Sequence, residues 1–229
     1  MNRDELLRIA RDRLYPSLTN PNYLVLRARR VIFSDWMRNL PDGVDVLDVG
    51  GRYQPYRPLL QEKTKTYVAL DVEPSELLSV RASGEHLPFA DASFDLAIAT
   101  QVFEYFEVPQ QAAAELYRVL RPGGVLLMST AFLAPRFVDE ELWRYTAQGL
   151  RNLLAAFAQI TVQPELSNLA SVCRLKNLFL HDALILPALR KLYGFTICPV
   201  INLMGRAFEA AAFSRSDNWA GNYSVRAIK

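Results

Sequence analysis

Short apolar runs alternate with helical patterns along most of the chain. The run from Val44 to Val49 is rich in β-branched residues and leads directly into Gly50 and Gly51. This pattern is typical of a buried parallel strand that ends in a tight turn. Further apolar runs predict strands at 67–70, 77–82, 96–99, 125–129 and 160–162, and an alternating run predicts a closing edge strand at 222–228.

Apolar residues at helical spacing occur before the first strand and between the later ones. They predict helices at 3–14, 23–40, 55–62, 108–120 and 146–158. The segment 166–213 also has helical spacing, broken at Pro187, Gly194 and Pro199. Because alternating strands and helices specify a parallel sheet with helices on both faces, the fold class is α/β, doubly wound and mostly parallel.

The chain of 229 residues is expected to form a single domain. We divide it into an N-terminal helical cap (1–42), a core (43–163), a helical insertion or lid (164–215) and a closing strand (216–229).

Composition narrows the classes of protein only slightly. The formal net charge of +2 argues neither for nor against nucleic acid, and we expect no such partner. Cys173 and Cys198 have no spacing to His or Cys that predicts a metal site, and free thiols in a reducing compartment are the simplest interpretation. The N-terminus lacks the apolar core of a signal peptide, and no run of 18 apolar residues is present. We therefore expect a cytoplasmic protein.

An acidic residue follows the second strand. Asp71 comes directly after the run 67–70, roughly 20 residues beyond the paired glycines, where an acid can reach a ribose hydroxyl. The first half of the core is therefore expected to bind a nucleotide.

Four sequence blocks make this expectation specific. They are LDVGG (47–51), LDVEP (70–74), GEHLPFADASFDLAIATQVFEYF (84–106) and ELYRVLRPGGVLLMST (115–130). In this order the blocks resemble the class I S-adenosylmethionine-dependent methyltransferases, in particular the small-molecule branch called type 11, over roughly residues 44–163. The resemblance implies a seven-stranded Rossmann-like sheet with an antiparallel last strand, and S-adenosylmethionine as the cofactor.

The resemblance also implies which residues bind that cofactor. Asp48 would help hold its amino end, Asp71 would grip both ribose hydroxyls, and Val72 would pack on the adenine. The full set of implied cofactor residues is Asp48, Gly50, Gly51, Asp71, Val72, Ser83, Gly84, Glu85, Thr100 and Gln101. In the family motif D-x-G-x-G-x-G, this chain has Arg52 and Gln54 at the second and third glycine positions.

Candidate catalytic residues are few. An oxygen acceptor must lose its proton, usually to His, Asp or Glu. His86 is interpreted as a surface residue of the adenine loop, and Glu104 as part of the local structure after its strand. Tyr105, where relatives often have His, and His181 remain as the candidates that would face the substrate.

Residues 139–150 resemble the W-R-Y/F-T-x-x-G-L block of methyltransferases found with glycan and cell-envelope biosynthesis. Trp143 and Arg144 would present a stacking face and an anion-binding fork to the acceptor. The alternative is that Trp143 only packs the loop over the sheet.

Two surfaces remain open to interpretation. Arg27, Arg29 and Arg30 are interpreted as a solvated helix face, with a phosphate contact as the alternative. The apolar and basic residues of 166–213 predict a lid, core or dimer contact, with a peripheral membrane surface as the alternative.

The function predicted is methyl transfer from S-adenosylmethionine to a small molecule, glycan or lipid-linked sugar, at oxygen. Another secondary metabolite or a quinone-like compound is the alternative acceptor. A non-catalytic interaction module on a degenerate methyltransferase fold is the alternative from another class.

Overall fold

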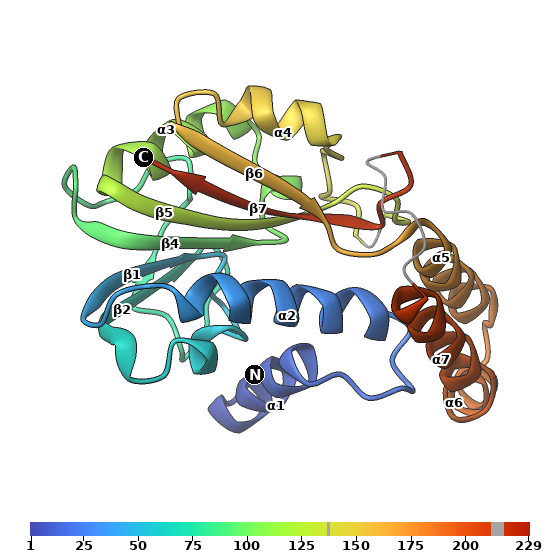
Figure 1. Cartoon of the computed structure of the whole chain (residues 1–229). Coiled ribbons are helices and arrows are strands. Elements are labelled where there is room, and N and C mark those ends of the chain that lie inside the picture. The colour runs from blue at the N-terminus through green and yellow to red at the C-terminus, as the bar shows by residue number, and fades with distance from the viewer. Residues whose placement is uncertain (137, 212–217) are drawn as a thin grey trace.

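The computed structural model describes residues 1–136, 138–211 and 218–229, and its centre is a seven-stranded sheet (Figure 1). The strand order is β3-β2-β1-β4-β5-β7-β6, and β7 runs antiparallel to both of its neighbours. The strands are β1 (Val44–Val49), β2 (Thr64–Asp71), β3 (Val80–Arg81), β4 (Phe94–Thr100), β5 (Leu120–Ala131), β6 (Gln159–Pro164) and β7 (Asn222–Ile228). The predicted doubly wound sheet with an antiparallel last strand is confirmed.

Helices cover both faces of this sheet. Figure 1 shows α1 and α2 on one face, α3 and α4 on the other, and α5, α6 and α7 grouped beyond one end of the strands. The helices are α1 (Arg3–Leu14), α2 (Tyr23–Arg38), α3 (Pro109–Val119), α4 (Ala147–Leu153), α5 (Asn168–Ala183), α6 (Pro187–Phe195) and α7 (Ile197–Ala210). The predicted N-terminal helices and the helical C-terminal insertion are therefore confirmed, while the boundary expected at 215/216 lies outside the described residues.

The central strand β1 supplies both layers of the core. Its side chains alternate between the faces of the sheet, because successive residues of a strand point in opposite directions. Val46 packs into a cluster with Phe33 of α2, whereas Leu47 joins the opposite cluster with Leu116 of α3. Both strand residues are fully buried, so the first apolar run of the sequence fixes the middle of the fold.

Three predicted elements are shorter or different in the structure. The segment 55–62 forms two short 3₁₀ turns instead of a helix, because Pro58 cannot donate a backbone hydrogen bond within a continuous helix. The strand expected at 77–82 is only Val80–Arg81, after a loop tied down by the Ser75 hydroxyl. The helix expected to reach residue 158 ends at Leu153.

The helices of the C-terminal insertion dock onto the start of α2. Leu24 and Val25 of α2 form one apolar cluster with Cys173 of α5 and Ile201 of α7. The approach is close at Gly205, where an added Cβ atom would lie 2.5 Å from Leu24. This packing holds the insertion beside the edge of the sheet that contains the carboxyl ends of β1 and β4.

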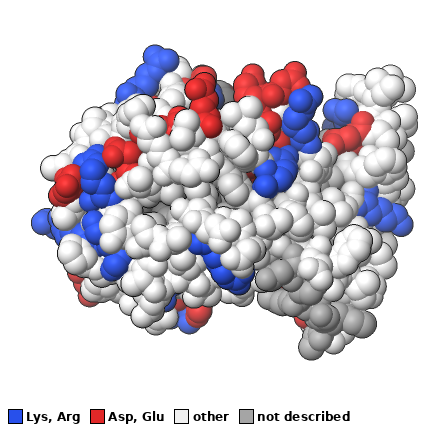
Figure 2. Space-filling view, turned by 90° about the horizontal axis from the view of Figure 1, so that it is seen from above, with Lys and Arg blue, Asp and Glu red and all other residues white. Residues whose placement is uncertain are grey.

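Charged side chains are mixed on the face seen in Figure 2. Among the residues drawn there in blue and red, Lys and Arg lie close to Asp and Glu, with broad uncharged areas between them. On this face the described residues form no continuous basic field of the kind to which a nucleic-acid backbone binds.

A buried ion pair connects the cap, the sheet and the insertion. Arg29 of α2 donates from Nε and Nη2 to the two carboxylate oxygens of Glu165, at 2.8 and 3.1 Å. The hydroxyls of Ser129 on β5 and Ser224 on β7 each donate to Glu165 Oε1 at 2.8 Å. Burial alone would lower the pKa of Arg29, but the carboxylate outweighs it and raises that pKa. The interpretation of Arg29 as solvated is wrong, because it faces the sheet and not the solvent.

We predict that Glu165→Gln lowers the free energy of unfolding by about 3–5 kcal/mol, because it leaves a buried guanidinium without its counter-charge. Denaturant unfolding measures the change. The control is Asp35→Asn, which breaks the exposed Arg38–Asp35 pair and is expected to cost less than about 1 kcal/mol. Equal effects of the two substitutions would contradict the role of the buried pair.

Candidate functional site

The turn after β1 is shaped for close approach. Gly50 has φ +75°, in the left-handed region that favours glycine, and its amide donates to the Leu70 carbonyl at 2.9 Å. A Cβ atom on Gly50 would lie 2.9 Å from the Val102 side chain, and one on Gly84 would lie 2.7 Å from Phe106. Gly50 and Gly84 therefore have no side chain because none would fit beside Val102 and Phe106.

A cavity of about 200 Å³ opens beside this turn. Asp71, at the tip of β2, lines it together with Val72, and Asp71 Oδ1 accepts a hydrogen bond from the Glu73 amide at 3.0 Å. Asp71 Oδ2 has no hydrogen-bond partner among the described residues. A carboxylate placed in this way can accept hydrogen bonds from a ligand.

The opposite wall of the small cavity is the loop Ser83–Gly84–Glu85. Glu85 Oε1 accepts the Val108 amide at 2.6 Å, and the Ser83 hydroxyl accepts the Glu85 amide at 3.2 Å. These bonds fix the loop against the start of α3. The residues expected at the adenine edge are thus brought to the same cavity as Asp71, Val72 and Gly50.

Asp48 lies beneath the turn rather than in a cavity lining. Its carboxylate is buried and accepts a hydrogen bond from the Tyr67 hydroxyl at 2.6 Å. Burial raises the pKa of Asp48 to about 7, and the nearby Asp71 raises it further against the effect of the Tyr67 bond. Gly51 packs directly on it, because a Cβ there would lie 2.9 Å from the Asp48 carboxyl carbon.

Gln54, at the third glycine position of the family motif, has a backbone conformation that favours glycine. Its φ is +52°, which is strained for any residue with a side chain. Its amide nitrogen donates to the Leu77 carbonyl and its amide oxygen accepts from Arg57 at 3.0 Å. Side-chain hydrogen bonds therefore hold a backbone shape that glycine would adopt freely.

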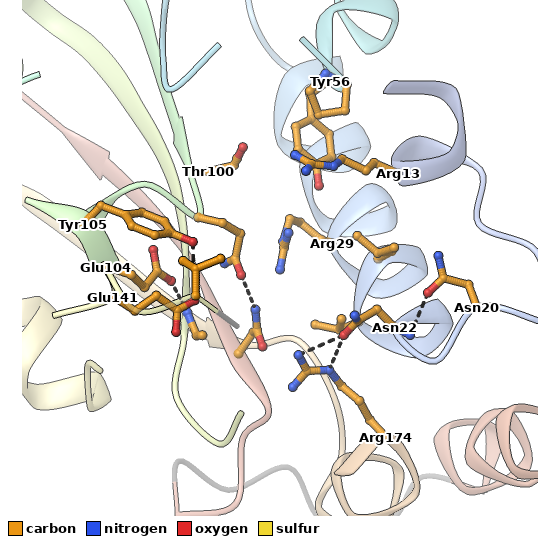
Figure 3. A pocket seen from close by; sticks show the side chains of 17 residues that line it. Arg13, Asn20, Asn22, Arg29, Tyr56, Thr100, Glu104, Tyr105, Glu141 and Arg174 are labelled. Atoms are coloured by element: carbon orange, nitrogen blue, oxygen red, sulfur yellow. Dashed lines mark hydrogen bonds between the residues drawn. The ribbon is translucent and has the colours of Figure 1, made fainter. Parts of the chain in front are cut away.

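A second, larger cavity of about 450 Å³ lies next to the first (Figure 3). Tyr105 lines both cavities, so its side chain stands where they meet. Burial, followed by the charges of Glu141 and Glu104, raises the pKa of Tyr105 to about 12, and the phenol donates to Glu141 at 3.3 Å. Tyr105 is thus a neutral hydrogen-bond donor at neutral pH and not a base.

The floor of the large cavity begins at the end of β4. Thr100 and Gln101 both line it. Gln101 has φ +52°, and its side chain donates to the Ser129 hydroxyl at 3.1 Å and accepts from Asn222 at 3.1 Å. A non-glycine residue held in this conformation at the end of a strand is a feature found at functional sites.

Glu104, which the sequence suggested was only local structure, lines the large cavity as well. It does have a local role, since Oε1 accepts the Ala131 amide at 2.6 Å and the main-chain carbonyl accepts the Leu142 amide at 2.7 Å. However, Oε2 is buried without a hydrogen-bond partner among the described residues, and burial raises the pKa of Glu104 to about 7. Its position directly before Tyr105, after a central strand, was the available signal.

Three arginines from different elements also line the large cavity: Arg13 of α1, Arg29 of α2 and Arg174 of α5 (Figure 3). Sequence reasoning did not assign any of them to the site. A signal existed for Arg29, because it is four residues from both Val25 and Phe33 and so belongs to the buried stripe of α2. Arg13 and Arg174 carry no such signal, since only the tertiary fold brings α1 and α5 together.

The other expected substrate residues do not line either cavity. Trp143 donates its indole N–H to the Phe106 carbonyl at 2.7 Å and packs the loop. Arg144 forms an ion pair with Glu141, which itself lines the large cavity. His181 lies farther along α5 than Arg174 and contacts Asp182.

Two further expectations concern metals and membranes. Among the described residues, no group of three or more His, Cys, Asp or Glu side chains is arranged to hold a metal ion. Within the same part of the chain, no helix combines the length and the hydrophobicity needed to cross a membrane. Cys173 and Cys198 are free and buried.

Comparison with known proteins assigns the family of the central segment. Residues 47–128 match the family described as "Methyltransferase domain". An uncharacterized methyltransferase of Mycobacterium sp. (strain KMS) is 36% identical over 106 residues, and one of Mycobacterium tuberculosis (strain H37Rv) is 33% identical over 108 residues. The matched segment covers 42% of this chain and 42% of each relative, so less than half of either protein is compared.

Solved structures share the fold over most of the chain. A S-adenosylmethionine-dependent methyltransferase of Thermotoga maritima has a TM-score of 0.55 at 17% identity, covering 95% of this chain and 94% of that one. One from Archaeoglobus fulgidus also has a TM-score of 0.55, at 12% identity, covering 92% and 95%. The [4+2]-cyclase SpnF has a TM-score of 0.54 at 20% identity, covering 86% and 80%. Residues 47–128 therefore match a methyltransferase domain, and the chain shares its fold with solved S-adenosylmethionine-dependent methyltransferases.

Proposed function

We propose that the protein transfers the methyl group of S-adenosylmethionine to an oxygen atom of a small-molecule or glycan acceptor. The observation that carries this proposal is the pair of adjoining cavities at the carboxyl ends of β1, β2 and β4, with Tyr105 lining both. Ligands of open α/β sheets bind at these strand ends. Two adjoining cavities would hold the cofactor and the acceptor separately and let them meet only beside Tyr105.

The small cavity fits the nucleoside part of the cofactor. Asp71 Oδ2 is available to ribose hydroxyls, Val72 to the adenine face, and the loop 83–85 to the adenine edge. Gly50 lines the same cavity, where its backbone would lie against the chain that joins ribose to the amino-acid tail. Asp48 beneath the turn would act on the amino group through its charge, while Thr100 and Gln101 would lie below the methyl group.

When bound, S-adenosylmethionine would supply an electrophilic methyl group, which would pass to the acceptor oxygen while the electrons of its bond to sulfur stay on sulfur. The residues of this chain must orient the acceptor and remove its proton. Glu104 is suited to the second task for three reasons: it lines the large cavity, its Oε2 has no hydrogen-bond partner among the described residues, and a pKa of about 7 lets it accept and release a proton near neutrality. Tyr105 would turn its O–H from Glu141 to the acceptor or the cofactor, and Glu104 would pass its proton to solvent.

The alternatives from the sequence remain open to test. A different secondary metabolite or a quinone-like acceptor would use the same two cavities. A non-catalytic interaction module would not need a buried acid such as Glu104 without a partner, which costs stability unless a ligand uses it. The [4+2]-cyclase with this fold illustrates that the architecture alone does not fix the reaction.

An exposed apolar surface supports contact with a membrane that contains anionic lipids. We define the α6 surface as Phe179, Ile185, Leu186, Leu189, Leu192 and Phe195, all of which are exposed. Arg190 and Lys191 lie among them, and α6 has no acidic residue. Apolar side chains beside cations suit the boundary between anionic headgroups and acyl chains. The protein would then meet a lipid-linked glycan of cell-envelope biosynthesis at the cytoplasmic surface.

We predict that Asp71→Asn raises the Kd for S-adenosylmethionine at least about tenfold, because an amide oxygen replaces a charged acceptor. Isothermal titration calorimetry measures the affinity. Glu73→Gln neutralises an exposed acid two residues away that does not line the cavity, and it should bind like the wild type. Absence of binding heat in the wild type, or equal affinities in the two variants, would contradict the cofactor site.

We predict that Glu104→Gln lowers methyl transfer at least about 100-fold with the affinity for S-adenosylmethionine unchanged, because the base is lost. The assay follows labelled methyl groups from S-adenosylmethionine into a small-molecule extract of the source cells. Glu140→Gln, an exposed acid nearby, is the control. Transfer that survives Glu104→Gln would remove Glu104 as the base.

The pH dependence of protein stability tests the ionisation of Glu104 in the absence of a methyl acceptor. The unfolded carboxyl group loses its proton near pH 4 and the folded one near 7, so its contribution to stability is complete below about pH 4 and is lost as the pH rises to 7 and above. Relative to the wild type, Glu104→Gln should therefore be more stable at pH 8 than at pH 5. A difference independent of pH would show that Glu104 titrates normally.

For the α6 surface, we predict that the protein co-sediments with vesicles of phosphatidylcholine and phosphatidylglycerol, and that Ile185→Asp with Leu192→Asp abolishes this. Val31→Asp, an exposed apolar position on α2, is the control. Failure of the wild type to sediment would overturn the membrane proposal. Dimers that dissociate in the double variant would assign the surface to a second copy of the chain instead.

A further inference from the structure

The large cavity contains a buried positive charge without a negative partner of its own. Arg174 is 2% exposed and lines the cavity. Its Nε and Nη2 both donate to Asn22 Oδ1, at 3.2 and 3.1 Å, and Nη1 donates to the Leu133 carbonyl at 3.1 Å. Both acceptors are neutral, and Arg174 forms no ion pair with any residue that the structure describes.

Glu165 is the carboxylate whose charge acts on Arg174, but it already forms an ion pair with Arg29. Glu165 receives both arms of Arg29 and two serine hydroxyls. The charge of Glu165 favours protonated Arg174, whereas burial and the charges of Arg29 and Arg144 oppose it, and the pKa of Arg174 falls to about 10. Arg174 is still a cation at neutral pH. Two guanidinium groups therefore share a single glutamate.

The other acidic side chains around the cavity do not neutralise this excess positive charge. Glu141 is paired with Arg144. Glu104 has a pKa of about 7, so it is partly neutral at physiological pH. An unbalanced charge in a site of low dielectric constant costs free energy, and an anionic ligand recovers that cost.

The position of Arg174 separates it from the cofactor end of the cavity. In Figure 3, Thr100 on the sheet side and Tyr56 and Arg13 across from it mark one end of the cavity, while Arg174 lies at the other end with Asn22. Thr100 ends β4 beside the small cavity, whereas Arg174 projects from the insertion helix α5. Gly221 allows the guanidinium to lie there, because a Cβ on it would be 3.3 Å from Arg174 Nη1.

We propose that Arg174, together with Asn22, binds an anionic group of the methyl acceptor, a carboxylate or a phosphate, at the end of the large cavity remote from the cofactor. This inference rests on the proposed function, since it names the class of acceptor for the same site. Three of the five N–H groups of Arg174 are bonded, which leaves one on Nη1 and one on Nη2 to donate to the oxygens of an anion. The acceptor is thus held by its charge while its hydroxyl lies toward Glu104 and Tyr105.

Thermal unfolding in saturating S-adenosylhomocysteine tests the anion site, with inorganic phosphate and acetate as separate probes and sodium chloride at equal ionic strength as reference. We expect phosphate or acetate to raise the Tm of the wild type by about 2–4 °C at concentrations well above its Kd. The probe that acts identifies the anion as phosphate or carboxylate. The shift should disappear in Arg174→Gln and persist in Arg206→Gln, which changes an exposed arginine of α7.

A second variant keeps the test valid if Arg174→Gln folds poorly. Asn22→Asp places a carboxylate where Arg174 now finds a neutral acceptor, so it should fold stably, bind S-adenosylhomocysteine normally and lose the response to anions. Retention of the full anion shift in Asn22→Asp would overturn the proposal.

The outcomes separate this inference from the proposed function. If S-adenosylhomocysteine does not bind the wild type, the proposed function fails. If it binds but neither probe shifts the Tm beyond sodium chloride, only the anion site is wrong. A loss of S-adenosylhomocysteine affinity of tenfold or more in Arg174→Gln would also overturn the inference, because Arg174 would then serve the cofactor.

Discussion

The pairing of Arg29 with Glu165 is the interaction on which the site depends. It joins α2 to the residue that follows β6, and through Ser129 and Ser224 it reaches the facing positions of β5 and β7. Breaking a buried pair of this kind is costly because the remaining charge has no solvent. The pair closes one side of the large cavity and so fixes where the cap, the sheet and the C-terminal insertion meet.

The same pair sets the electrostatics of the cavity. By occupying Glu165, Arg29 leaves Arg174 with only neutral partners, and the excess positive charge faces the space where an acceptor would lie. Burial meanwhile keeps two acids, Asp48 and Glu104, at pKa values of about 7. Groups held away from their ordinary ionisation cost stability, and they are found mainly where a ligand or a proton transfer uses them. A single cavity thus combines a fixed cation with an acid able to exchange a proton.

The sequence predicted the architecture well because its signals are local. The run from Val44 to Val49 defines a central strand by its apolar and β-branched residues, and Pro109 marks the start of α3. The elements that differed were those in which a single residue overrides periodicity, such as Pro58 within the first of the two 3₁₀ turns. Gln54 is a related case, since its left-handed backbone is held by hydrogen bonds that no motif reveals.

The site was predictable only in part, and for a physical reason. Asp71 and Gly50 lie at strand ends, so alignment with a motif is enough to find them. Arg13, Arg29 and Arg174 come from three helices that are far apart in the sequence, and their proximity follows from packing. The role of Glu104 depends on burial and on one unpartnered oxygen, and neither is visible in a sequence. Of the residues expected from the acceptor-side motif, Trp143 instead donates to the Phe106 carbonyl after β4, and Arg144 donates to the Pro135 carbonyl.

The central claim is that the small cavity binds the cofactor and the large one the acceptor, with Tyr105 between them. A crystal structure of the protein with S-adenosylhomocysteine tests it most directly. We predict electron density for adenosine in the small cavity, with both ribose hydroxyls on the Asp71 carboxylate and the space between Glu104 and Arg174 left to solvent. Adenosine bound in the large cavity, against Arg174, would contradict the account.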